Sequence, residues 1–253
     1  MKKFSLLGAA LAAATRRQAI KAVMLSAVAL GAAPGAFAGS YAEVGDAGDI
    51  VSGAPQAVTG AAGETITSIA GTLGFVAGIS EVDAYKIYIN SPSTFSASTT
   101  AFVPGANNNN FDTQLFLFSL SGVGIVGNDD DGISGGAQST IPAGTSFVSS
   151  LTPGYYILMV TGGQNPASSG GLIFPSWTTG ADPTGVYGPT GPGGSLPISS
   201  FGSGSNEGGA YAIALTGVTT SAVAVPEPSS MCLGLAGGLA LLVFRRRRQG
   251  SDR

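Results

Sequence analysis

The sequence predicts an all-β protein, an antiparallel β-sandwich or jelly roll, with an N-terminal signal peptide and a C-terminal single transmembrane helix. Three observations predict this fold class. Between residues 40 and 224 no stretch sustains the 3.6-residue apolar period of a helix. Several short runs in the same region are patterned as strands, and turn residues separate them. Both ends of the chain, in contrast, combine an apolar stretch with basic residues.

The predicted strands differ in how many of their faces are apolar. Residues 83–89 alternate, with the large apolar side chains on one face and Lys86 and Tyr88 on the other. Residues 114–118 and 155–160 are apolar on both faces, so we expect central strands that are covered from both sides. Residues 94–99 alternate around Phe95, residues 210–215 alternate large and small side chains as in a strand with one tightly packed face, and residues 65–69 are a weaker strand candidate.

A long segment rich in Gly, Pro and Ser, residues 162–209, interrupts the strand pattern. Four of its glycines recur every third residue from 185 to 194, but a collagen helix needs many more triplets. The composition therefore predicts a flexible insertion between two strands. Trp177, the only tryptophan, serves either as an exposed ligand platform or as a pin that holds the insertion to the sheet, and we favour the pin.

Composition excludes several classes of chemistry. The chain has no histidine and a single cysteine, Cys232, so Ser-His-Asp and Cys-His catalysis, imidazole zinc sites and an internal disulfide are all excluded. Between residues 39 and 224 there are twelve acids and one cation, Lys86, a net charge of −11. Such a body does not bind a phosphate backbone, so nucleic acid is excluded as a partner. Any metal site has to use oxygen ligands.

The N-terminus has the pattern of an export signal. Residues 1–38 run from a basic opening through an apolar stretch that is too short to span a bilayer. The stretch ends at Ala36-Phe37-Ala38, the small-x-small pattern that predicts cleavage before Gly39. Arg16 and Arg17 are the candidate pair of a twin-arginine signal, and the general and twin-arginine export routes both stay open.

The C-terminal region carries the most specific pattern. A rigid Pro-Glu-Pro linker is followed by a short apolar segment, residues 230–244, which contains Cys232. A cluster of four arginines comes next and predicts a cytoplasmic terminus with the acidic body outside. A plain tail anchor accounts for the helix and the arginines but not for the linker. The motif residues are Val225, Pro226, Glu227, Pro228 and Ser229, and the stop-transfer residues are Arg245, Arg246, Arg247 and Arg248.

In order and composition this tail resembles the PEP-CTERM sorting signal of Gram-negative bacteria. The resemblance implies that an exosortase, a membrane cysteine protease, recognises the tail and removes it near the motif. It also implies a surface or extracellular-matrix protein of a polysaccharide-producing cell. The chain is then the substrate of that protease and not an enzyme.

The body is similar to the bacterial pre-peptidase C-terminal domain. The similarity rests on an Asp-opened strand (83–87), an Asp-Thr-x-Leu strand (111–118), an Asn-Asp-Asp loop (128–131) and a Pro-Gly-Tyr-Tyr strand (151–158). It spans roughly residues 64–217. The resemblance implies a small β-sandwich that binds or assists and does not catalyse.

One loop predicts a metal site. Residues 128–132 place three carboxylates and an amide in a turn, and calcium relieves the repulsion between such groups. The alternative is a solvated β-turn in which Asp and Asn serve turn geometry. The candidate calcium ligands are Asp112, Asn128, Asp129, Asp130 and Asp131.

Together these patterns predict an exported, non-catalytic cell-surface or matrix protein that is anchored transiently in the inner membrane. The alternative is a carbohydrate-binding module or carbohydrate-active enzyme that acts on the cell's own exopolysaccharide. The expected partners are the export machinery, an exosortase, the membrane and, under the alternative, exopolysaccharide. The predicted organisation is a signal peptide (1–38), an extension (39–63), the sandwich (64–217) with its insertion (162–209), a linker (218–224), the sorting signal (225–248) and a tail (249–253).

Overall fold

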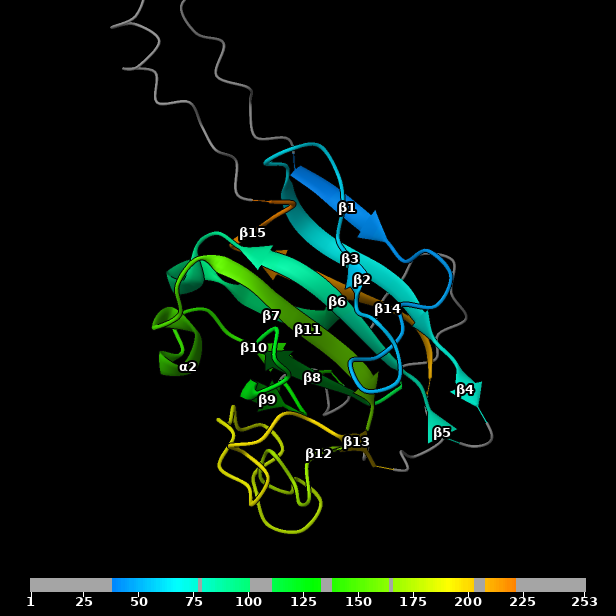
Figure 1. The fold of residues 1–253 in the computed structure, drawn as a ribbon, viewed down its shortest axis with the longest axis vertical. Coiled ribbons are helices and arrows are strands. Elements are labelled where there is room, and N and C mark those ends of the chain that lie inside the picture. The colour runs from blue at the N-terminus through cyan, green and yellow to red at the C-terminus, as the bar shows by residue number, and fades with distance from the viewer. Residues whose placement is uncertain are drawn as a thin grey trace, which may run out of the picture. The chain divides into compact units, whose positions relative to one another are not determined.

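The structure is a computed structural model that describes residues 38–76, 79–100, 111–132, 138–163, 166–202 and 208–221. Strands dominate these ranges (Figure 1). The predicted signal peptide, apart from Ala38, lies outside the described residues. The predicted sorting signal and the tail after it also lie outside them.

The strands form one large sheet and two small ones. The large sheet contains β1 (Ala38–Ala42), β2 (Gln56–Ala57), β3 (Thr65–Leu73), β6 (Val82–Ile89), β7 (Ser96–Thr100), β8 (Thr113–Phe118), β9 (Gly124–Asn128), β10 (Thr140–Ile141), β11 (Gly154–Gly162), β14 (Gly209–Thr216) and β15 (Val218–Thr219). The small sheets pair β4 (Phe75–Val76) with β5 (Ile79–Ser80) and β12 (Ala167–Ser168) with β13 (Ser200–Phe201). Within the described ranges the helical elements are single turns, the 3₁₀ helix η1 (Pro92–Thr94) and the α-helix α2 (Ser146–Ser149).

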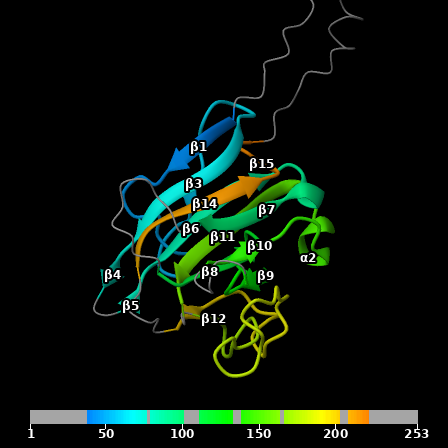
Figure 2. The ribbon, with the colours of Figure 1, turned by 180° about the vertical axis from the view of Figure 1, so that it is seen from behind.

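The large sheet is folded into two layers. Its strand order is β10-β7-β14-β3-β15-β6-β11-β8-β9, with β1 added beside β3 and β2 beside β6. The short β15 links β3 to β6, and the strands on either side of this link pack face to face (Figures 1 and 2). Ile69 and Ile213 from one layer share a buried core with Ile87, Leu117 and Leu158 from the other. The predicted all-β, sandwich-like architecture is confirmed.

The structure differs from the prediction in where the sandwich begins and in two strand pairings. β1 pairs with β3 and β2 pairs with β6, both in parallel, whereas the other pairings are antiparallel. Residues 39–63, which we expected to form an extension before the sandwich, therefore supply two of its strands. At the other end Val218 and Thr219 pair with β6, so the sheet continues into the predicted linker.

Glu64 connects the first and last described strands. Ala38 and Thr219 both pair with Thr65, one on each side of β3. The backbone carbonyl of Glu64 accepts a hydrogen bond from the Thr220 amide at 3.0 Å. Its carboxylate lies against Gly39, where any larger residue would collide with it. The predicted cleavage site therefore lies in a strand beside the point where the chain leaves the sheet toward its tail.

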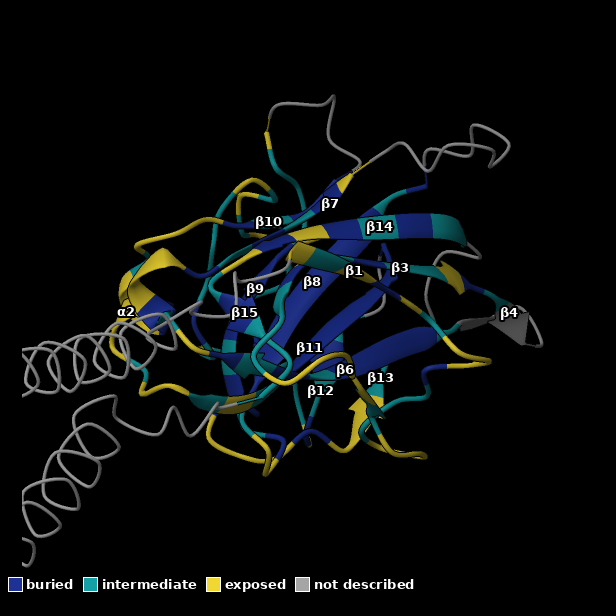
Figure 3. Cartoon of the chain, turned by 90° about the horizontal axis from the view of Figure 1, so that it is seen from above, coloured by how far each residue is buried: buried dark blue, intermediate teal, exposed yellow. Residues whose placement is uncertain are grey.

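The insertion covers the outer face of the layer that contains β6, β11, β8 and β9. β8 is buried on both faces, as its sequence predicted, and so is β11 from Ile157 onward, whereas Tyr155 in the predicted run is exposed (Figure 3). On the outer face Phe116 stacks against Phe174 of the insertion, with ring centroids 5.3 Å apart and an interplanar angle of 27°. Trp177 stacks in turn against Phe174 and is 8% exposed. The predicted role of Trp177 as a pin is confirmed, and the prediction of a flexible insertion is wrong for residues 166–202.

Close backbone contacts explain the glycines of the insertion. A side chain at Gly191 would collide with the carbonyl of Leu172, and one at Gly194 with the carbonyl of Pro189. Glycine is required at such positions because a Cβ atom does not fit between the two chain segments. The period-three glycines thus allow a tightly folded cover, which composition alone does not distinguish from a flexible linker.

Candidate functional site

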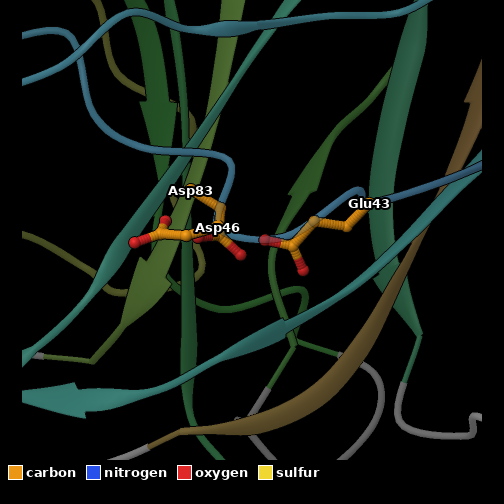
Figure 4. A group of neighbouring side chains, drawn as sticks. All are labelled: Glu43, Asp46 and Asp83. Carbon is orange, nitrogen blue, oxygen red and sulfur yellow. The ribbon is translucent and has the colours of Figure 1, made fainter.

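Three acidic side chains meet at one edge of the sandwich. Glu43 follows β1, Asp46 lies in the next loop, and Asp83 is the second residue of β6. One carboxylate oxygen from each lies within 4.8 Å of one from each of the others (Figure 4). We call these three residues the acidic cluster. Among the described residues, this is the one set of acids that meets so closely.

Backbone amides fix two members of the acidic cluster. The Glu43 carboxylate accepts hydrogen bonds from the amide of Ala47 at 2.9 Å and from that of Thr72 at 2.8 Å. The Asp46 carboxylate accepts a hydrogen bond from the amide of Gly48 at 2.8 Å. The carbonyl of Gly48 accepts a hydrogen bond from the amide of Ala84 in β6, also at 2.8 Å. The loop is therefore tied to both β3 and β6.

Asp83 belongs to a buried chain of hydroxyl groups. The Tyr211 hydroxyl donates to Oδ2 of Asp83 at 2.6 Å, and it is 2.5 Å from the hydroxyl of Tyr85. All three residues are almost completely buried, with Asp83 1% exposed. Gly71 leaves room for this arrangement, because a side chain there would collide with the Tyr211 hydroxyl and the Glu43 carboxylate.

Burial without a countercharge governs the electrostatics of this cluster. Burial raises the pKa of Asp83 to about 7; the Tyr211 hydrogen bond opposes the rise, and the charges of Glu43, Asp46 and Glu81 add to it. Burial also raises the pKa of Tyr211 above its usual range. Lys86 is the one cation among the described residues, and it lies over the ring of Tyr155. The cluster therefore has two ways to lower its energy, which are to bind a proton or to bind a cation.

Structural hydrogen bonds hold Asn128, the first residue of the predicted calcium loop. Asn128 is fully buried; its amide nitrogen donates to the carbonyls of Asp130 and Gly185 at 3.0 Å, and its Oδ1 accepts from the Thr140 amide at 2.6 Å. Its side chain thus joins the loop to β10 and to the insertion. Its position in the acidic turn predicts Asn128 as a calcium ligand, but both polar atoms of its side chain have protein partners, which the spacing does not show.

The other predicted ligands lie around the same loop. Asp129 accepts a hydrogen bond from Nε2 of Gln114 at 2.8 Å. Burial, followed by the charge of Asp131, raises the pKa of Asp130. Asp112 lies where β8 begins, with its carboxylate against Gly163. The Asp130 amide donates a hydrogen bond to the carbonyl of Pro183 in the insertion at 2.9 Å, and calcium binding at this loop stays a prediction.

Sequence reasoning missed the acidic cluster because its members are distant in the chain. The alternation of residues 83–89 does place Asp83 on the inward face with Tyr85, and that was the available signal. It did not reveal that Glu43 and Asp46 would be carried to the same edge, since the pairing of β1 with β3 is not encoded in any local pattern.

Comparison with known proteins identifies the tail. Residues 224–248 match the family model of the PEP-CTERM protein-sorting motif. No curated protein and no solved structure is significantly similar to the chain. The similarity of the body to the pre-peptidase C-terminal domain is therefore not supported and stays a prediction. Among the described residues no helix is long and apolar enough to cross a membrane, and the predicted membrane segment lies outside them.

Proposed function

We propose that the chain is an exported, non-catalytic cell-surface or extracellular-matrix protein. The observation that carries the proposal is the PEP-CTERM motif at residues 224–248, which marks an exported substrate of an exosortase. The membrane segment holds the chain until the protease acts, and the body is then delivered to the cell surface or the surrounding matrix. The motif does not specify what the delivered body does there.

Composition and burial support a non-catalytic body. Without histidine, the chain has no imidazole base, and its single cysteine lies within the predicted membrane segment. The acidic cluster does not offer two accessible carboxylates for catalysis, because Asp83 is 1% exposed and Glu43 accepts hydrogen bonds from two backbone amides. A glycosidase needs two carboxylates that reach a substrate from opposite sides of a cleft. The cluster instead has the features of a structural site.

Replacing Pro226, Glu227 and Pro228 with alanine should stop processing of the tail. In the native host, the unaltered chain is expected to lose the mass of its tail and leave the membrane fraction, whereas the variant keeps both its mass and its membrane association. Pulse-labelling followed by membrane fractionation and intact-mass measurement checks this. Ser230→Ala, just beyond the motif, is the matched control. Equal processing of the triple variant, or processing in a host without exosortase, contradicts the proposal.

We further propose that calcium stabilises the body, and the acidic cluster supports this idea more strongly than the predicted loop. Calcium takes six to eight oxygen ligands at about 2.3–2.6 Å, and clustered carboxylates attract it because it removes their mutual repulsion. In the cluster three carboxylates from separate elements meet with no cation of the described residues among them. Side chains of both places bind backbone groups, Asn128 in the loop and Glu43 in the cluster, so the preference for the cluster rests on the convergence of its three carboxylates.

Calcium should raise the melting temperature of the full-length chain, purified in mild detergent at pH 8, by several degrees relative to chelator. At about 100 times its dissociation constant, a ligand adds about 2.7 kcal/mol to the free energy of unfolding. Asp83→Asn should abolish the shift, and the Asp129→Asn, Asp131→Asn double variant should retain it. The reverse result would assign calcium to the predicted loop. The absence of any shift would refute calcium binding at both places.

A further inference from the structure

The Glu64 carboxylate lies between two glycines at one end of the sandwich. Its Oε2 accepts a hydrogen bond from the Ala61 amide at 2.8 Å, within the turn that precedes β3. Its Oε1 lies against Gly39 and its Oε2 against Gly60, and a Cβ atom at either glycine would collide with it. The half-buried carboxylate is therefore held against the backbone of the second residue of β1.

The backbone nitrogen of Gly39 is close to this carboxylate. Because backbone geometry fixes that nitrogen about 2.5 Å from the position of a Cβ atom, which Oε1 of Glu64 overlaps, the nitrogen and Oε1 are at most about 5 Å apart. In the uncut chain the nitrogen is a neutral amide. The small-x-small pattern predicts a cut before Gly39, and this cut converts the amide into an α-ammonium that is free to turn toward the carboxylate.

The cut adds a second cation to a strongly acidic region. Between residues 39 and 224 the only cationic side chain is Lys86, against twelve acids, and its ammonium lies over the ring of Tyr155. The ammonium of Gly39 would be the other cation of this region, and the fold places it beside a carboxylate. Such a neighbour stabilises the charged form of an amine and raises its pKa.

Glu64 is the one titratable side chain in the segments that surround the new terminus. β3, residues 60–64 and residues 218–221 contain no other Asp, Glu, Lys, Cys or Tyr. In β1 itself, the hydroxyl of Tyr41 donates a hydrogen bond to Gln56 at 2.9 Å. The Glu64 carboxylate is therefore the group in these segments that determines the electrostatic surroundings of the terminus.

We propose that Glu64 binds the amino terminus that a cut before Gly39 creates. The ion pair fixes the start of β1 on β3 and, through the same turn, the point where the chain leaves the sheet toward its tail. At that point the Thr220 amide donates to the Glu64 carbonyl at 3.0 Å, and the Thr220 hydroxyl donates to the Ala61 carbonyl at 2.6 Å. β1 begins and β15 ends at this same end of the sandwich (Figures 1 and 2). Removal of the signal peptide thus stabilises the fold next to the segment that leads to the sorting signal. The inference rests on the proposed export for the cut itself.

Acylation of the amino terminus tests the ion pair directly. The other lysines lie in the signal peptide, so a chain cut before Gly39 has two amines, its terminus and Lys86, and Lys86→Arg leaves one. This parent chain is produced in a host without exosortase, so that it keeps its tail, and is purified in mild detergent. N-terminal sequencing establishes that it begins at Gly39, and intact mass against time gives the acylation rate.

Glu64→Gln should raise the acylation rate about tenfold near neutral pH. Only the neutral amine reacts, and the variant removes the charge that raises the pKa of the terminus. At about pH 10 the amine is neutral in both chains, so the two rates should converge. A rate that stays higher at that pH would mean that the variant exposes the terminus by fraying β1, and would overturn the proposed pairing.

Glu81→Gln is the matched control. Glu81 also lies against a glycine, Gly74, and accepts a hydrogen bond from its amide at 3.0 Å, but it lies beyond the other end of β3. This variant should acylate at the parent rate, and in denaturant all three chains should react equally. Equal rates for the parent and Glu64→Gln in the folded state, or a cut at any other residue, would overturn the inference. A chain that keeps its signal peptide would instead contradict the proposed export, and tail processing is measured separately.

Discussion

Replacing Phe174 with alanine is expected to lower the free energy of unfolding by about 3–5 kcal/mol. Phe174 is 3% exposed and contacts three aromatic residues, Phe116, Phe118 and Trp177, so its removal leaves a cavity in the apolar cluster between β8 and the insertion. The loss should also release the insertion from the outer face of β8. Denaturant unfolding gives the free energy, and limited proteolysis reports new cleavage within residues 166–202.

Leu196→Ala is the control for this prediction, because Leu196 belongs to the same insertion but is 49% exposed. Its substitution should change the free energy of unfolding by about 0.5 kcal/mol or less. If Phe174→Ala and Leu196→Ala have similar small effects, the insertion does not contribute to the packed structure, and the composition-based expectation of a flexible segment is restored.

The sequence predicted that β8 and β11 need a cover but not which segment provides it. Their apolar residues on both faces indicated burial on both sides, because an exposed apolar face is costly. The cover contains few apolar residues, chiefly Ile173, Phe174 and Trp177, within a segment whose composition is typical of linkers. Its glycines are needed for close contacts between distant backbone segments, and such contacts leave no local pattern in the sequence.

For the candidate sites, a run of consecutive residues and a grouping of distant residues point to different places. Three aspartates in a row predict a calcium site at residues 129–131, which stays a prediction, and the structure adds that their neighbour Asn128 binds backbone groups with its side chain. The closest acidic grouping among the described residues joins Asp83 to two acids that are about 40 residues away along the chain. In contrast, the sorting motif is a linear pattern that a protease recognises in the chain itself, so sequence alone was sufficient to identify it.

Asp83 should make the body less stable as the pH rises from about 4 to about 7, when calcium is absent. In the folded chain, burial raises the pKa of Asp83 to about 7, whereas an unfolded aspartate titrates near 3.9. Between these values the folded chain holds a proton that the unfolded chain has lost, so stability falls with increasing pH and levels off above the folded pKa. The full difference between the two pKa values corresponds to a loss of about 4 kcal/mol in the free energy of unfolding.

Denaturant unfolding in chelator at several pH values between 4 and 8 measures this effect. Asp83→Asn keeps an acceptor for the Tyr211 hydroxyl but has no charge, so it should remove most of the fall and be the more stable chain at pH 8. A smaller fall should remain, because burial also raises the pKa of Asp130. Asp182→Asn, which changes an exposed acid of the insertion, should follow the unaltered chain. Parallel pH profiles for Asp83→Asn and the unaltered chain would contradict the prediction.

The Asp83 carboxylate links the pH dependence of stability to the binding of calcium. Glu43, Asp46 and Glu81 all add negative charge near Asp83, so the ionised cluster is stable only if a proton or a cation offsets that charge. Calcium added at pH 8 should therefore restore the stability that was lost between pH 4 and pH 7, and it should have little effect at pH 4, where protonated Asp83 is a poor ligand. A pH-dependent fall that calcium does not reverse would mean that the cluster holds a proton and no metal. A surface protein with such a cluster would then be stabilised by acidity in its surroundings and not by their calcium content.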